Sequence, residues 1–208
     1  MLDDSFTNRT DVFVRPHGLE VGADVGAGAS WTLSNAEASE EGGMLRLSHA
    51  PAGTNSSGAV YGTLWFTEKK LPLDGTVVEF SFMYPDPVNA HDMNWWFPTP
   101  TADNNVYTDS GTTDPFYVWG AHGWGGQLSG MERSDGGSAL VEAVGPEPGK
   151  IHDAIYASHN GKQAFFLDGK LVVSYEERSP INATEGYFGF SVFESTVMLG
   201  AISIGRLP

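Results

Sequence analysis

Alternating apolar and polar positions between Ile151 and Glu176 predict a ribbon of consecutive antiparallel strands. The first strand ends at Asn160-Gly161 and the second at Asp168-Gly169, two dipeptides that accept the positive φ angles of tight hairpin turns. These turns fix the register of both strand pairs, because a slip of one residue would turn every side chain to the other face. The ribbon is typical of a β-sandwich.

The rest of the chain repeats the strand pattern at short intervals. In the strongest example, Val78, Phe80 and Phe82 face one way and Glu79 and Ser81 the other. No segment of ten or more residues keeps a helical period, so we expect an all-β sandwich of two antiparallel sheets, as a single domain over residues 1–208. The further strands are expected at 44–49, 59–67, 91–97, 114–121, 127–134, 186–194 and 197–205.

The charge of the chain excludes several kinds of partner. The sequence has 26 acidic and 11 basic residues, a formal net charge of −15. Such an acidic surface repels phosphate backbones and anionic lipids, so we expect neither a nucleic-acid nor a membrane partner. Cysteine is absent, which removes disulfides, thiol catalysis and cysteine-ligated zinc together.

The location of the protein is predicted less directly. Residues 1–7 are polar and lack the pattern of a signal peptide. The acidic composition suits a secreted protein whose export signal has been removed, so we expect an extracellular or periplasmic location, while the sequence leaves a cytoplasmic one open.

The second half of the chain resembles the concanavalin A-like lectin/glucanase superfamily. The resemblance lies in the Asn160-Gly161 turn, the segments Phe165–Val172 and Gly186–Ser191, and the closing strand Ala201–Gly205. In layout, residues 30–206 are similar to small bacterial jelly-roll proteins of unassigned function that accompany the degradation of pectin and other uronate polysaccharides. The resemblance implies a jelly roll with a concave ligand face, and a polysaccharide or oligosaccharide as the partner.

Alternation along the strands predicts which residues line that face. If Val78, Met93, Trp95, Phe116 and Val118 are core, the opposite face receives Glu79, Ser81, Asp92, Asn94, Trp96, Tyr117 and Trp119, with Gln127, Ser129 and Arg133 from the next strand. Aromatic rings suit the apolar faces of sugars, and amides and acids suit their hydroxyls. The expected substrate-binding residues are Glu79, His91, Asp92, Trp96, Trp119, Trp124 and Gln127.

The residue types on this face fit β-elimination of a uronate, which makes a polysaccharide lyase the leading hypothesis. Elimination needs one group that neutralises the C5 carboxylate and another that moves the C5 proton. Asn94, Gln127 or Arg133 would neutralise, and Tyr117 or His122 would act as the base, so the expected catalytic residues are Tyr117, His122, Arg133 and Asn94. The chain contains neither the Gln-Ile-His nor the Tyr-Phe-Lys-x-Gly segment of alginate lyases.

Three alternatives to a lyase stay open. A non-catalytic carbohydrate-binding module would keep the aromatic residues and need no base. A retaining glycoside hydrolase is disfavoured, because it requires two carboxylates about 5 Å apart, whereas Glu79 stands alone and Glu132 is expected to face away from Arg133. In a structural or interaction protein, Trp96, Trp119 and Trp124 would form a partner interface.

The sequence assigns no metal ligand and requires no cofactor. His152 and His159 are expected on opposite faces of one strand, so they do not converge on a zinc ion. A structural Ca²⁺ is compatible with the fold, with Asp3, Asp4 and Asp103 as candidate ligands.

Overall fold

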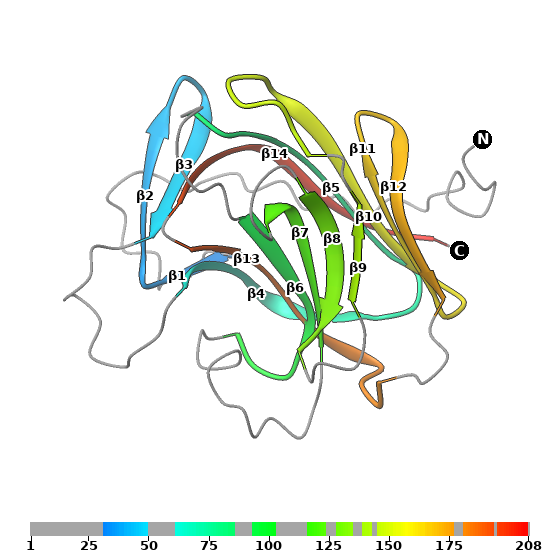
Figure 1. The fold of residues 1–208 in the computed structure, drawn as a ribbon. Helices are drawn as coiled ribbons and strands as arrows, with labels where there is room; N and C mark the ends of the chain where they lie inside the picture. The colour runs from blue at the N-terminus through cyan, green and yellow to red at the C-terminus, as the bar shows by residue number, and fades with distance from the viewer. Residues whose placement is uncertain are drawn as a thin grey trace.

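The computed structural model describes nine stretches of the chain, and their regular structure is entirely β (Figure 1). It describes residues 31–49, 61–85, 93–102, 116–123, 128–134, 139–142, 145–176, 181–193 and 195–207. Within these residues there is no helix long and apolar enough to cross a membrane. The predicted all-β fold class is confirmed.

The strands form two antiparallel sheets of seven strands each, counted over the described residues. The sheet called here the β6 sheet has the order β1 (Trp31–Ser34), β4 (Gly62–Pro72), β13 (Glu185–Val192), β6 (Met93–Thr99), β7 (Tyr117–Gly123), β8 (Leu128–Arg133) and β9 (Ala139–Glu142). The other, called the β5 sheet, has the order β12 (Lys170–Glu176), β11 (Lys162–Leu167), β10 (His152–His159), β5 (Thr76–Met83), β14 (Thr196–Arg206), β3 (Met44–His49) and β2 (Ala36–Glu41).

The predicted ribbon is confirmed as β10, β11 and β12. Asn160 has a φ of 51° and Gly161 one of 73°, and the pair closes a hairpin in which Ser158 lies opposite Gln163. Asp168 and Gly169 repeat these angles at 51° and 74° between β11 and β12. Both turns therefore use the left-handed backbone region that Asn, Asp and Gly adopt most readily.

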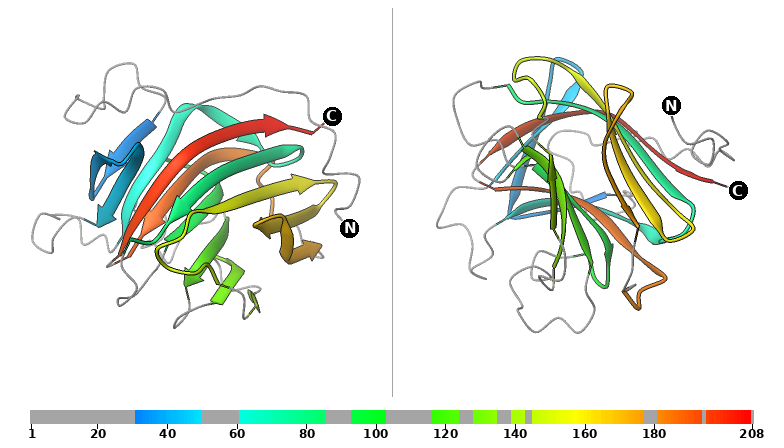
Figure 2. Two further views of the ribbon diagram at one scale, coloured as in Figure 1. Left: turned by 90° about the horizontal axis from the view of Figure 1, so that it is seen from above. Right: turned by 45° about the vertical axis from the view of Figure 1, so that its right-hand side comes forward.

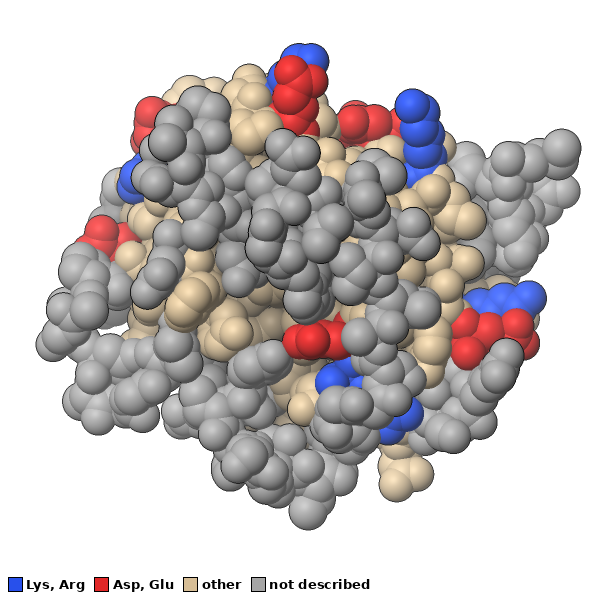
Figure 3. Space-filling model, viewed as in Figure 1, with Lys and Arg blue, Asp and Glu red and all other residues tan. Residues whose placement is uncertain are grey.

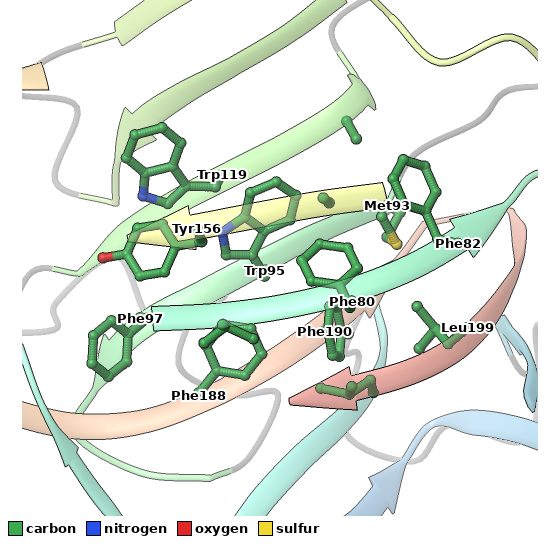
Figure 4. Close-up of a cluster of buried hydrophobic side chains, with 14 of the residues drawn as sticks. Phe80, Phe82, Met93, Trp95, Phe97, Trp119, Tyr156, Phe188, Phe190 and Leu199 are labelled. Carbon is green, nitrogen blue, oxygen red and sulfur yellow. The ribbon is translucent and has the colours of Figure 1, made fainter. Parts of the chain in front are cut away.

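The main core lies between the two sheets and contains many aromatic rings (Figure 4). Phe80 of β5 packs edge-on against Trp95 of β6 with ring centroids 5.3 Å apart, and against Phe190 of β13 at 4.9 Å. Trp95 also meets Phe165 of β11 at 4.9 Å. Edge-to-face contacts of this kind add about 0.5–1.5 kcal/mol each to the area that the rings bury.

Tyr84 joins the end of β5 to the β6 sheet. Its hydroxyl donates a hydrogen bond to the carbonyl of Ala121 in β7 and accepts one from the backbone N–H of Met93 in β6, at 3.2 Å. This buried bridge fixes β6 and β7 relative to β5. The long strands of both sheets bend together, and the outer face of the β6 sheet lies on the inside of the arc (Figures 1 and 2).

A glycine on the outer face of the β6 sheet makes room for a tryptophan. Gly189 of β13 lies opposite Trp65 of β4, and a Cβ atom at this position would be 2.3 Å from Cε3 of the Trp65 ring and 2.6 Å from Cζ3. Trp65 is completely buried. The ring therefore lies directly over the glycine backbone.

We expect Gly189→Ala to lower the free energy of unfolding by about 1–3 kcal/mol, because the indole ring must leave its site. Urea denaturation followed by circular dichroism measures the change. Gly205→Ala is the matched control, since a Cβ there meets nothing within 4 Å. Its stability should be unchanged or rise by up to about 1 kcal/mol. Equal stability of Gly189→Ala and wild type would contradict this packing.

Candidate functional site

Two rows of residues run across the outer face of the β6 sheet, in directly opposed positions on neighbouring strands. The first row, called here the aromatic row, consists of Thr32, Trp65, Gly189, Trp96, Val118 and Glu132. The second, called the polar row, consists of Ser34, Thr63, Ser191, Asn94, Gly120 and Gly130. Because side chains alternate along a strand, both rows share the face that points away from the main core.

The aromatic row belongs to a small hydrophobic cluster that is separate from the main core. Trp96 is its centre: its ring lies 5.7 Å from Trp65, 5.9 Å from Phe116 and 5.3 Å from Tyr61. The buried members, called here the outer cluster, are Trp65, Trp96, Phe116 and Val118. Trp96 is only 1% exposed, so it supports the face from within instead of offering a bare stacking surface.

The polar row places hydrogen-bonding groups beside the outer cluster. The indole N–H of Trp65 donates to the hydroxyl of Thr63 at 2.9 Å, and that hydroxyl donates to the carbonyl of Ser34 at 3.3 Å. Asn94 is 6% exposed, and Ser191 is fully buried with a hydroxyl that has no hydrogen-bond partner among the described residues. A buried hydroxyl without a partner costs about 1–3 kcal/mol, so Ser191 retains capacity for a buried water molecule.

The predicted faces of Tyr117 and Trp119 were wrong. Both side chains belong to the main core, where Trp119 stacks on Trp95 with centroids 6.5 Å apart and Tyr117 meets Tyr175 at 6.3 Å. Val118 faces outward instead. The error arose because β7 is apolar on both faces, so alternation of polar and apolar residues could not distinguish them.

The predicted faces of β8 were reversed as well, because both of its faces mix polar and apolar residues. Glu132 lies opposite Val118 and therefore shares the outer face, whereas Arg133 lies opposite Tyr117 on the inner side. Ser129 lies opposite Ala121, is fully buried and also faces inward. Sequence reasoning thus missed Glu132, whose half-buried carboxylate lies in the same row of the outer face as Trp96.

Glu79 does not join the face that carries Asn94. It lies on β5 in the other sheet, between Ile155 and Ser203, and its side chain points away from the core on the opposite side of the sandwich. The prediction put Glu79 and Asn94 on one face from the alternation along each strand, which does not say which sheet a strand joins. The chain instead changes sheets between them, which local patterning does not reveal.

Several predicted residues lie outside the described part of the chain. These are His91, Asp92, Trp124 and Gln127 among the site residues, and Asp3, Asp4 and Asp103 among the calcium candidates. His122 lies within β7, but its side chain is not described. Of the expected site residues, Asn94 and Trp96 are those whose described side chains share the outer face of the β6 sheet.

The histidines at the two ends of β10 contact carboxylates in neighbouring turns. His152 Nδ1 lies 2.8 Å from the Asp168 carboxylate and Nε2 lies 2.9 Å from the carbonyl of Glu147. Both contacts hold the ring against the turns on either side of it. Burial alone would raise the pKa of Asp168, but hydrogen bonds from His152 and the Asp153 N–H, with the charges of His152 and Lys170, hold it below its usual value.

His159, at the other end of β10, lies 3.6 Å from Asp74 in the turn before β5. Across the described residues, no group of three or more His, Asp or Glu side chains is arranged to hold a metal ion. The outer face of the β6 sheet is therefore the candidate site, and its described groups offer hydrogen bonds, apolar contacts and one carboxylate.

The fold is shared with solved structures, although no family model and no curated protein matches the sequence. A Bacillus subtilis protein of unknown function with a galectin-like fold covers 85% of this chain and 89% of its own, with a TM-score of 0.68 and 14% identity. The carbohydrate-binding module CBM66 from Bacillus subtilis gives 0.60 and 14%, over 85% of this chain and 96% of its own.

A third similar structure is the exoplasmic/lumenal domain of VIP36 in a form bound to Ca²⁺ and Man3GlcNAc, with a TM-score of 0.60 and 13% identity over 86% of this chain and 84% of its own. These similarities show the jelly-roll, concanavalin A-like fold that the sequence predicted. At such low identities they establish the architecture alone.

The Asp168 carboxylate should make the protein sensitive to acid. A carboxyl whose pKa is lowered by folding contributes stability that is complete above its unfolded pKa of about 4 and is lost as the pH falls through its folded pKa. We expect Asp168→Asn, which tolerates the same positive φ, to be less stable at pH 7 and to lose less stability between pH 5 and 3. Chemical denaturation across this range is the measurement.

The control for this experiment is Glu37→Gln on the exposed edge strand β2. Its loss of stability with acid should match the wild type. If Asp168→Asn followed the wild-type profile as well, the His152–Asp168 contact would contribute nothing to stability.

Proposed function

We propose that the protein binds a polysaccharide or oligosaccharide on the outer face of the β6 sheet. One observation carries the proposal: an aromatic cluster and a row of hydroxyl and amide groups adjoin on a sheet face that takes no part in the main core. An outer face that served only to meet solvent would not need a second set of buried tryptophans beside polar groups.

The chemistry of the face suits sugars. Apolar C–H faces of a sugar ring pack against an aromatic ring such as that of half-buried Tyr61, and its hydroxyls pair with the Asn94 amide and the Glu132 carboxylate. On the side drawn in Figure 3, acidic and basic side chains of the described residues lie next to one another at several points and do not gather into a patch of one sign. We therefore attribute recognition to these short-range contacts.

Two of the similar structures support this proposal. One is named as a carbohydrate-binding module, and the other is named as a form bound to Man3GlcNAc. We extend the proposal to an extracellular or periplasmic location, where polysaccharides occur. A structural Ca²⁺ is also part of it, because one of the similar structures was obtained with Ca²⁺. Asp3, Asp4 and Asp103 remain the candidate ligands.

Elimination of a uronate at the same face is the second candidate function. The observation in its favour is that Asn94 lies opposite Gly120, and His122 follows two residues later on the same strand. Asn94 would hold the uronate carboxylate and His122 would move the proton. Tyr117 and Arg133 lie on the inner side of the sheet and are not part of this proposal.

Glu132→Gln should weaken binding about tenfold, because it replaces a charge-assisted hydrogen bond by a neutral one. Asn94→Ala should have a similar effect. The matched control is Glu79→Gln, the same chemical change on the outer face of the other sheet, and it should bind within twofold of the wild type. Retention on a panel of neutral and uronate polysaccharides, with and without Ca²⁺, identifies the ligand, and titration of tryptophan fluorescence gives the affinities.

Ultraviolet absorbance of the unsaturated uronate product, followed on the same panel, separates the two candidates. Binding without product supports a binding module, whereas product formation that is lost in His122→Ala supports a lyase. Failure to bind any polymer, or equal weakening by Glu132→Gln and Glu79→Gln, would refute the proposed site.

A further inference from the structure

The turn between β10 and β11 contains the single Asn-Gly dipeptide of the sequence, Asn160-Gly161. In such a dipeptide the backbone nitrogen of the glycine can attack the side-chain amide of the asparagine, because glycine has no side chain to obstruct the approach. Both residues are exposed, and a Cβ at Gly161 would meet nothing within 4 Å. His159 pairs with Lys162, so the Gly161 nitrogen belongs to the turn and not to the strand ladder. The attacking nitrogen therefore has open space beside it.

Two side chains hold the Asn160 end of this turn. Nδ2 of Asn160 donates a hydrogen bond to Nε2 of His159 at 2.8 Å, and Nδ1 of the same imidazole lies 3.6 Å from the Asp74 carboxylate. Asp74 also accepts the backbone N–H of Asn160 at 2.6 Å. The nitrogen that would leave in an attack on the amide is thus in contact with an imidazole that a carboxylate holds in place.

We propose that Asn160 is a site of deamidation in the folded protein, and that His159 protonates the leaving nitrogen. The nitrogen of Gly161 loses its proton to water and bonds to Cγ of Asn160, and the electron pair of the Cγ–Nδ2 bond leaves with Nδ2. His159 gives that nitrogen the proton with which it departs as ammonia, and then takes another proton from water. Water opens the cyclic imide that remains. The product is an aspartate, or an isoaspartate in which the main chain runs through the former side chain.

The turn between β11 and β12 shows that an aspartate fits this geometry. Asp168 has a φ of 51°, as Asn160 does, and its carboxylate lies 2.8 Å from Nδ1 of His152. An aspartate at position 160 can pair with His159 in the same way. Asp168 itself is a poor target for attack by Gly169, because its lowered pKa keeps it ionised and a carboxylate resists nucleophiles.

The isoaspartate product would weaken the turn. It adds a carbon to the main chain at the point that fixes the register in which Ser158 lies opposite Gln163. Deamidation would therefore add a negative charge to the hairpin as each molecule ages, and in its isoaspartate form it would loosen β10 from β11. This inference does not rest on the proposed function.

Peptide mapping by mass spectrometry tests the proposal on the full chain, incubated for weeks at neutral pH. Asn160 should deamidate faster than Asn182, an exposed asparagine that is followed by Ala183. His159→Gln keeps a polar side chain but removes the proton donor, and it should slow the reaction at Asn160 by at least about tenfold. In the urea-unfolded chain, where Asp74 no longer holds the imidazole, the wild type and this variant should react at equal rates.

His152→Gln is the matched control, because it makes the same chemical change at the other end of β10, where the histidine contacts Asp168. The rate at Asn160 in this variant should equal that of the wild type, and the unfolding temperature of each variant shows that the folded state is being compared. A folded wild type in which Asn160 reacts no faster than Asn182 would overturn the proposal, as would equal rates for the folded wild type and His159→Gln. Neither outcome bears on carbohydrate binding, which the polysaccharide panel tests separately.

Discussion

The packing of Phe80 against Trp95 holds the two sheets together, and the orientation of the candidate site follows from it. Each fully buried ring contributes about 1.5–3 kcal/mol, so turning β6 over to expose Trp95 would cost more than any surface contact could return. With Trp95 fixed inward, alternation sends its neighbours Asn94 and Trp96 outward. The same core contact that stabilises the sandwich therefore decides which residues can meet a ligand.

Sequence reasoning predicted the orientation of a strand correctly only where its two faces differ in polarity. β5 alternates Val78, Phe80 and Phe82 with Glu79 and Ser81, and its buried residues were predicted correctly. The hairpins were predictable because their turns need residues that accept positive φ. β7 was not, because Phe116 and Val118 on one face are as apolar as the residues on the other. A strand that is apolar on both faces loses the alternation that sequence reasoning depends on.

Two further aspects of the site depend on relationships that no local pattern contains. Which sheet a strand joins is decided by pairing partners far away in sequence, and this separated Glu79 from Asn94. The burial of Trp96 results from Tyr61, Trp65 and Phe116, which come from different strands. As a tryptophan, Trp96 was expected to stack on a ligand. Its neighbours bury it instead, so it supports the sheet face from within. The inward position of Tyr117 and Arg133 in turn removes two of the four groups expected for elimination.

The outer cluster holds the polar row in position, a property that would suit the proposed binding site. Thr63 is held by the Trp65 indole, and Trp65 is held by the close approach of its ring to the Gly189 backbone. Polar groups at the margin of such a rigid support would not have to be ordered when a ligand binds, so less of the binding energy would be spent on fixing side chains. The outer cluster therefore stabilises the fold and also holds the polar row in position. Both effects depend on the same tryptophans. Substitutions in this cluster will consequently change folding and binding together, and only the half-buried groups at its margin, such as Glu132, can report on binding alone.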